Sequence, residues 1–182
     1  DSSAFNLSKR LGRIQDPERL GVLQDGKTAG FFTHVNLAID AENSAIIGLA
    51  DVLYWMRPKG VKAPKASAPI EEKESFKWLL GARNAYQVLQ TAQQLTYVFD
   101  READNFELLQ YLQNELKSDF VIRSNHDRKV TRQDKQLLLS QCLEQSQAVG
   151  CYEIDLPAQD HYSWTSGKRI KRRARKAQIE IR

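Results

Sequence analysis

The stretch 95–123 constrains the fold most, because it places two short apolar strands on either side of one amphipathic helix. The run LTYVF, residues 95–99, predicts a buried strand that ends at Asp100. Leucines 108, 109, 112 and 116 share one face of the predicted helix, and FVIR, residues 120–123, predicts the second strand. A strand, a helix and a strand in this order predict a parallel crossover, and therefore a sheet of the α/β class.

Two further strands are expected ahead of this segment. Residues 33–39 alternate, with Val35, Leu37 and Ile39 on one side, which is typical of a half-buried strand. Residues 45–55 are rich in branched and aromatic side chains and predict its antiparallel neighbour. The proline-rich and lysine-rich stretch that follows predicts a loop, and an amphipathic helix is expected from Glu74. The predicted apolar stripe of that helix consists of Phe76, Leu79, Leu80, Tyr86, Leu89 and Ala92.

The pattern changes beyond Arg128. A short helix is expected at about 134–145, followed by strands at 152–156 and 177–181 around a glycine-containing turn. This predicts a β-hairpin lobe added to the α/β body. We therefore expect two parts, an α/β core over 1–130 and an added β-rich lobe over 131–182.

The positive charge is concentrated at one end of the chain. The 182 residues carry a formal net charge of +4, yet Lys168 to Arg182 contain eight Lys or Arg and a single acid, Glu180. The rest of the chain holds 19 bases and 22 acids. A basic block beside a slightly acidic body favours a polyanionic partner such as nucleic acid, and the alternative is a solvated basic tail.

Cysteine spacing and hydropathy narrow the class of protein. Cys142 and Cys151 lie nine positions apart, which matches neither a zinc site nor a disulfide framework, so both are expected to be buried small side chains. No apolar run approaches the roughly 20 residues of a membrane span. These features favour a cytoplasmic protein. The chain starts at Asp1 and its one methionine is Met56, so we expect it to be a piece of a longer protein.

Asp100 allows two interpretations, because it follows a predicted buried strand and precedes a helix. It can cap the turn, as aspartates at strand ends commonly do. It can also bind a metal ion, since ligands of α/β sheets gather at the carboxyl ends of strands and Mg²⁺ prefers carboxylate oxygens. The sequence around it, taken alone, leaves both open.

Several blocks resemble the DDE transposases of bacterial insertion sequences, specifically the insertion sequence four family. The main blocks are FDREAD at 99–104 and RSNHDRK at 123–129. The others, in the family's order, are DSSAFNLS at 1–8, WMRP at 55–58, EEKESFKW at 71–78, GKR at 167–169 and RARKA at 173–177. The resemblance implies a ribonuclease-H-like mixed sheet with flanking helices and an inserted β-rich lobe, truncated at both ends.

The resemblance also implies the catalytic residues. Asp1 and Asp100 match the family's two aspartates, which end the first and fourth strands and hold Mg²⁺ or Mn²⁺, with two ions in the complete enzyme. The family's third carboxylate, a glutamate on a later helix, has no match. Glu180 is not a credible substitute because it lies in a predicted strand. We expect the glutamate to lie outside this chain, so the isolated chain should be nearly inactive.

The implied function is metal-dependent phosphodiester hydrolysis and strand transfer at transposon ends, by a bacterial, nucleoid-associated protein that forms a homodimer in its synaptic complex. Double-stranded DNA is the expected partner, with transposon ends and target both bound, and no membrane is involved. One alternative is a non-catalytic DNA-binding or regulatory remnant of a decayed element, and a weaker one is a cellular nuclease. The expected DNA-binding residues are Lys73, Lys77, Arg123, Asn125, His126, Arg128, Lys129, Lys168, Arg169, Lys171, Arg172, Arg173 and Arg175.

Overall fold

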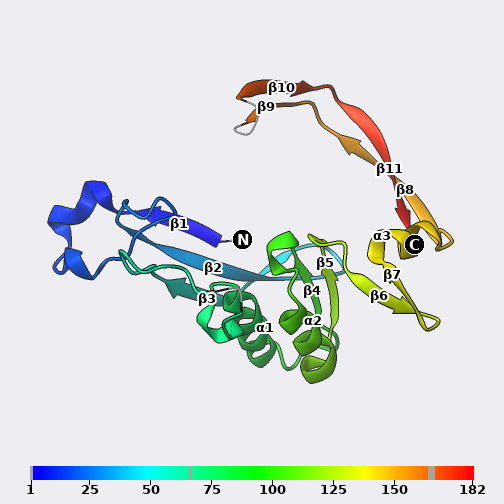
Figure 1. Cartoon of the computed structure of the whole chain (residues 1–182), viewed down its shortest axis with the longest axis horizontal. Coiled ribbons are helices and arrows are strands. Elements are labelled where there is room, and N and C mark those ends of the chain that lie inside the picture. Colours follow the sequence, from blue (N-terminus) through cyan, green and yellow to red (C-terminus); the bar gives the residue numbers. More distant parts are fainter. Residues whose placement is uncertain (1, 66, 164–166) are drawn as a thin grey trace. The chain divides into compact units, whose positions relative to one another are not determined.

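The computed structural model describes residues 2–65, 67–163 and 167–182, so Asp1, one of the two expected metal ligands, lies outside the described residues. The chain is mixed α/β, with many strands and few helices, as the sequence predicts (Figure 1). Its internal contacts divide it into two units, 1–126 and 127–182. Within the described residues, no helix is long and apolar enough to cross a membrane.

The first sheet of unit 1–126 has three antiparallel strands in the order β1-β2-β3. Their bounds are Ser2–Asn6, Gly30–Ile39 and Ile46–Trp55. The two long strands confirm the predicted pair, and the tight connection between them closes with the Asp40 N–H donating to the Ala45 carbonyl at 2.9 Å. β1 begins at Ser2 and continues to Asn6, so this strand runs on beyond the position where the resemblance ends it.

The second sheet confirms the predicted parallel crossover. β4, Thr96–Phe99, pairs in parallel with β5, Asp119–Ile122. The helical connection consists of α2, Phe106–Gln110, which continues directly into one π-helical stretch, Tyr111–Leu116. The register aligns Phe99 with Ile122, so both strands end at the same edge.

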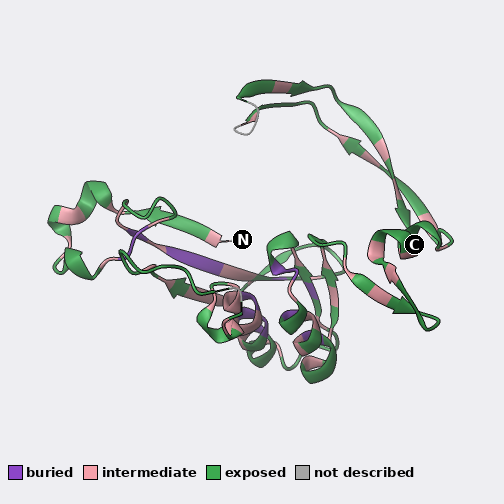
Figure 2. Ribbon diagram, viewed as in Figure 1, coloured by how far each residue is buried: buried purple, intermediate pink, exposed green. Residues whose placement is uncertain are grey.

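Helix α1, Phe76–Val88, packs on the first sheet, and together with the crossover it forms one hydrophobic core (Figure 2). Leu108 and Leu112 are fully buried, as the leucine pattern predicts. The stripe predicted for α1 is partly wrong, because its buried positions are Trp78, Gly81, Ala82 and Ala85, whereas Tyr86 is exposed. Small residues on this face allow the helix to approach the sheet closely.

The buried side of β2 is the opposite of the predicted one. Phe32, His34 and Ala38 are buried, whereas Leu37 and Ile39 are 51% and 55% exposed. The physical reason lies in the partner helix, where Gly81 leaves room for Asn36: an added Cβ would lie 2.3 Å from the Asn36 Nδ2 atom. Alternation shows that a strand has two faces but not which face the helix covers.

Unit 127–182 begins with a short hairpin followed by a helix. β6, Lys129–Arg132, pairs with β7, Lys135–Leu138, and α3 covers only Leu139–Glu144. The predicted helix at 134–145 is therefore wrong in its first part. Gln133 and Asp134 have φ values of 50° and 61°, the left-handed conformation that both central residues of a two-residue hairpin loop adopt.

The rest of this unit is a long two-stranded ribbon. β8, Gly150–Leu156, pairs antiparallel with β11, Arg175–Ile181, and β9, Gln159–Ser163, pairs antiparallel with β10, Lys168–Arg172. The structure confirms the predicted strands at 152–156 and 177–181, and adds β9 and β10. Cys142 is half-buried and Cys151 is exposed, so the expectation that both are buried is wrong for Cys151.

The division between the units falls four residues before the expected boundary at 130/131. Asp127 explains the position, because its carboxylate accepts hydrogen bonds from the Ser140 N–H and the Ser140 hydroxyl at 2.9 and 2.7 Å. The Arg128 carbonyl likewise accepts from the Leu139 N–H. Both residues are thereby tied to α3. The remaining short helices are 3-10 turns at Ser8–Arg13, Pro17–Arg19, Ile70–Glu72 and Arg101–Ala103.

Replacing Leu108 by alanine tests the core. Because Leu108 is completely buried, Leu108→Ala should lower the free energy of unfolding by about 2–5 kcal/mol. The control is Leu49→Ala, at a position that is 61% exposed, which should change it by less than about 0.5 kcal/mol. Urea unfolding followed by tryptophan fluorescence measures both. Equal losses in the two variants would contradict this core.

Candidate functional site

Asp100 lies immediately after β4 and is exposed. Its carboxylate oxygen Oδ1 accepts a hydrogen bond from the Glu102 N–H at 2.9 Å and so caps the 3-10 helix Arg101–Ala103. This confirms the capping interpretation. Capping uses only Oδ1. The second oxygen, Oδ2, accepts no hydrogen bond from any described residue. Capping therefore leaves one carboxylate oxygen open at the strand end.

Arg123 lies beside Asp100 at the same sheet edge. Its N–H donates to the Phe99 carbonyl at 3.3 Å, which extends the parallel ladder by one step. Its side chain is exposed. Parallel pairing thus brings an open carboxylate and an arginine to adjacent strand ends, where the sequence predicts them.

Asp104 holds the loop that follows β5. It is only 9% exposed, and its Oδ2 atom accepts from the backbone N–H groups of Asn125 and His126 at 2.7 and 3.1 Å. The cap of α2 is the next residue, Asn105, whose side chain accepts from the Leu108 N–H. The exposed side chains of Asn125 and His126 contact each other at 3.3 Å.

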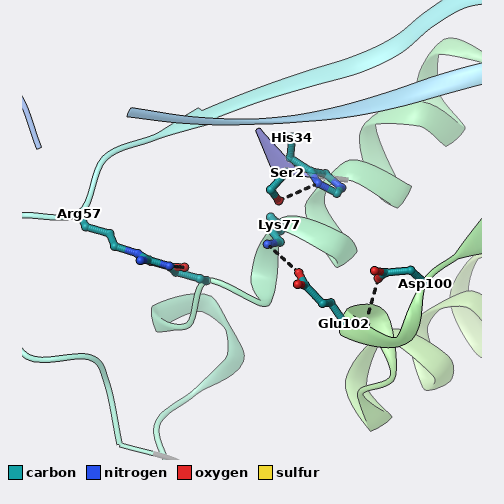
Figure 3. A network of polar contacts seen from close by, with 7 residues as sticks. Ser2, His34, Arg57, Lys77, Asp100 and Glu102 are labelled. Atoms are coloured by element: carbon teal, nitrogen blue, oxygen red, sulfur yellow. Dashed lines mark hydrogen bonds and ion pairs between the residues drawn. The ribbon is translucent and has the colours of Figure 1, made fainter. Parts of the chain in front are cut away.

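Lys77 is mostly buried, although it is predicted to contact DNA. Its side chain is 13% exposed, and Nζ lies 3.7 Å from the Glu102 carboxylate (Figure 3). The same ammonium lies 5.2 and 5.4 Å from the ring centres of Trp55 and Trp78, within the range of cation–π attraction. The charge of Lys77 is therefore held against the turn formed by residues 100–104, called the DREAD turn below. Lys73, the other predicted lysine on this segment, is half-buried after the 3-10 helix Ile70–Glu72.

Arg57 and Glu74 join the end of β3 to the start of α1. The guanidinium forms a two-point ion pair with the Glu74 carboxylate, with Nη2 to Oε2 at 2.6 Å, and lies over the Phe32 ring at 4.6 Å. The hydrogen bond from Arg57 lowers the pKa of Glu74, and the bond to Glu74 raises the pKa of Arg57. This pair fixes the geometry of the segment that carries Lys77.

His34, on β2, is a buried histidine that the sequence analysis did not single out. It is 1% exposed, its Nδ1 atom lies 3.3 Å from the Ser2 hydroxyl, and its ring meets Trp78 edge-on at 4.3 Å. Its Nε2 atom is buried without a hydrogen-bond partner among the described residues. Burial lowers the pKa of the imidazole to about 4, so His34 is neutral at pH 7.

Of the two expected metal ligands, Asp100 lies within the described residues. Asp100 offers an exposed carboxylate oxygen, a ligand type that suits Mg²⁺. No three His, Cys, Asp or Glu side chains within ranges 2–65, 67–163 and 167–182 gather to hold an ion. Asp100 thus fits one ligand position, and Asp1, the expected second ligand, is outside the described part of the chain.

The remaining predicted DNA-binding residues belong to unit 127–182. Arg128 is half-buried, and Lys129 is exposed at the start of β6. The basic block is exposed along the ribbon, with Arg169 paired to Asp160 at 2.7 Å. The members of this block that are predicted to bind DNA are Lys168, Arg169, Lys171 and Arg172 on β10, Arg173 after it and Arg175 on β11.

A comparison with known protein families finds none whose model matches this chain. The similarity to insertion-sequence transposases therefore stays a prediction. The structure adds that contacts link three of its blocks, 55–58, 71–78 and 99–104, the last of which contains Asp100. The contacts are the Lys77–Glu102 ion pair (Figure 3), the Arg57–Glu74 ion pair and the approach of Lys77 to Trp55.

The buried His34 predicts a dependence of stability on pH. Its pKa is about 4 in the folded chain against an ordinary 6.5, so between these values the unfolded chain binds a proton that the folded chain does not. The free energy of unfolding should therefore fall as pH drops from 6.5 to 5, by roughly 1–2 kcal/mol. Urea unfolding should show this fall in the wild type and a flatter profile in His34→Gln. His126→Gln, at an exposed position, should keep the wild-type slope; if it alone flattens the profile, the assignment to His34 is wrong.

Removing the Asp104 carboxylate should release the loop after β5. Asp104→Ala leaves two N–H groups without their acceptor, which should lower the free energy of unfolding by about 1–3 kcal/mol. Hydrogen exchange of the Asn125 and His126 amides should accelerate as well. Asp104→Asn retains an acceptor oxygen and should lie in between, and exposed Glu107→Ala is the control. Unchanged exchange at both amides in Asp104→Ala would show that the carboxylate does not hold this loop.

Proposed function

We propose that this chain is the central part of the catalytic domain of a DDE-type DNA transposase of the insertion sequence four family, with a ribonuclease-H-like core. The observation that carries the proposal is a series of contacts between three family-like blocks: 55–58 contacts 71–78 through Arg57 and Glu74, and 71–78 contacts 99–104 through Lys77 and Glu102, in the turn that Asp100 caps at the carboxyl end of β4. An antiparallel sheet followed by a parallel crossover is compatible with that core.

In this proposal, Asp100 and Asp1 hold the Mg²⁺ or Mn²⁺ ions. When bound, such ions stabilise the negative charge that develops on the attacking and leaving oxygens of a phosphodiester. Arg123 lies on the adjacent strand end, where its guanidinium can bind a phosphate next to Asp100. Lys77 and Glu102 hold the DREAD turn in place, and the exposed Asp100, capped through Oδ1, keeps its second oxygen available to an ion.

The working protein would be larger than this chain, with the third carboxylate on a later helix, and it would act as a homodimer on transposon ends and target DNA. The working protein would act in the bacterial cytoplasm, at the nucleoid. The basic ribbon provides the expected sequence-independent affinity for DNA phosphates, because its arginines and lysines are exposed.

A second candidate function is a DNA-binding or regulatory remnant without catalysis. It is favoured by one observation, that the basic ribbon belongs to a unit of its own and does not depend on Asp100. Both candidates predict binding to duplex DNA. They differ in whether the carboxylate at position 100 affects cleavage.

Asp100→Asn in the transposase that contains this chain should abolish Mg²⁺-dependent cleavage of transposon-end DNA, because the amide oxygen carries no charge to hold the ion. Affinity for the same DNA should remain within about twofold, since the phosphate contacts lie elsewhere. Cleavage is measured on labelled duplexes and affinity by gel shift.

Asp119→Asn is the matched control, because Asp119 is an exposed carboxylate at the opposite end of the same strand pair. It should cleave at the wild-type rate. Wild-type cleavage by Asp100→Asn would rule out the proposed role of Asp100. Binding without any cleavage by the wild type would instead support the remnant.

A further inference from the structure

The ribbon of unit 127–182 behaves as one hairpin with two distinct faces. In β9–β10, Lys168 pairs with Ser163 and Arg172 with Gln159, and in β8–β11 Arg175 pairs with Leu156. The register offset is the same in both pairs, so no residue is inserted where pairing stops, at 173–174 opposite 157–158. Pro157 lies in this break and has no N–H to complete the ladder.

Side chains alternate between the two faces of such a ribbon, and directly paired residues point to the same side. Because the offset is constant, the odd-numbered residues from 169 to 181 share one face with the even-numbered residues from 150 to 162. We name this the odd face, and the opposite side the even face. Figure 1 shows the two paired segments following one another along the ribbon.

The two faces differ in charge. The odd face carries four bases and one acid: Arg169, Lys171, Arg173 and Arg175, with Asp160. The even face carries three bases and three acids: Lys168, Arg172 and Lys176, with Asp155, Glu153 and Glu180. Counted from 150 to 163 and from 168 to 181, the odd face has a net charge of +3 and the even face a net charge of zero; Arg182, which follows β11 and binds Glu180 at 2.6 Å, brings the even side to +1.

The ribbon has an ion pair on each face, so ion pairing does not remove the difference in net charge between the faces. On the even face Lys176 is neutralised by Glu153 at 2.6 Å, and on the odd face Arg169 is bound to Asp160. Lys171, Arg173 and Arg175 form no ion pair with any residue that the structure describes. Successive bases of the odd face stand about 6.7 Å apart, two strand residues, and the row spans roughly 20 Å from Arg169 to Arg175.

We propose that the odd face of this hairpin binds the phosphate backbone of double-stranded DNA, and that the even face does not. The inference rests on the proposed function and narrows it, because it divides the basic block into contacting and non-contacting residues. A regular row of bases, three of them arginines that can bind phosphate oxygens at two points, suits a regularly charged polyanion. On the even face there are fewer bases, and three acids farther along the same face, in β8–β11, lower its net charge.

The test uses the 182-residue chain and a labelled 30-base-pair duplex, with binding followed by fluorescence anisotropy between 50 and 200 mM NaCl. The odd-face variant is Lys171→Gln with Arg173→Gln, and the even-face variant is Lys168→Gln with Arg172→Gln. Each removes one lysine and one arginine, all exposed and none in a recorded ion pair among the described residues. The two variants therefore have equal net charge.

Each phosphate contact contributes about 0.9 to the slope of log affinity against log salt. The odd-face variant should flatten the slope by about 1.8, and the even-face variant by less than about 0.5. Asp160→Asn, which frees Arg169, should tighten binding and steepen the slope. Far-UV circular dichroism monitors folding, and the single changes Lys171→Gln and Lys168→Gln replace the double variants if either fails to fold.

Equal losses in the two double variants, or a larger loss in the even-face variant, would overturn the face assignment while leaving DNA binding intact. Weaker binding by Asp160→Asn would do the same. Failure of the wild-type chain to bind duplex DNA with a salt-dependent affinity would overturn the DNA-binding part of the proposed function, and the face assignment with it.

Discussion

The parallel pairing of β4 with β5 is the constraint on which the candidate site depends. In a parallel pair both strands end at the same edge, so the register of Phe99 with Ile122 places Asp100 and Arg123 side by side although 22 residues separate them. The crossover is held by Leu108 and Leu112, which are completely buried, and by Ala103 in the turn after Asp100. Asp104 then fastens the loop after β5 to that same turn.

The second constraint is the placement of Lys77. Taking an ammonium out of water is unfavourable unless compensating contacts replace its hydration. Here Glu102 supplies a charge and the faces of Trp55 and Trp78 supply cation–π attraction. Lys77, a positive side chain on α1, therefore stabilises the turn in which the Glu102 N–H donates a hydrogen bond to Asp100. Arg57, bound to Glu74 at the start of the same segment, orients it from the other side.

The sequence predicted those parts of the fold in which hydrophobic spacing is decisive, such as the leucine helix between two apolar strands. It misled where spacing is ambiguous or tertiary contacts decide. The alternation in β2 could not show that the side with His34 and Asn36 is the buried one, because this depends on Gly81 in α1. β9 and β10 escaped prediction because a two-stranded ribbon buries neither face and needs no apolar alternation. The role of Asp104 depends on a loop 21 residues away.

Because neither face of the two-stranded ribbon is buried in a core, the ribbon can carry a dense row of basic side chains. Neighbouring charges about 6.7 Å apart repel by roughly 0.6 kcal/mol in water before screening, and Asp160 relieves this at only one end of the row. Cross-strand pairing holds the strands of the ribbon together, so the exposed bases stay in a row and their repulsion remains in the free chain. A polyanion removes that repulsion and adds attraction, whereas salt removes both. Salt should therefore stabilise the free ribbon while weakening its complexes, which separates a binding surface from a merely solvated tail.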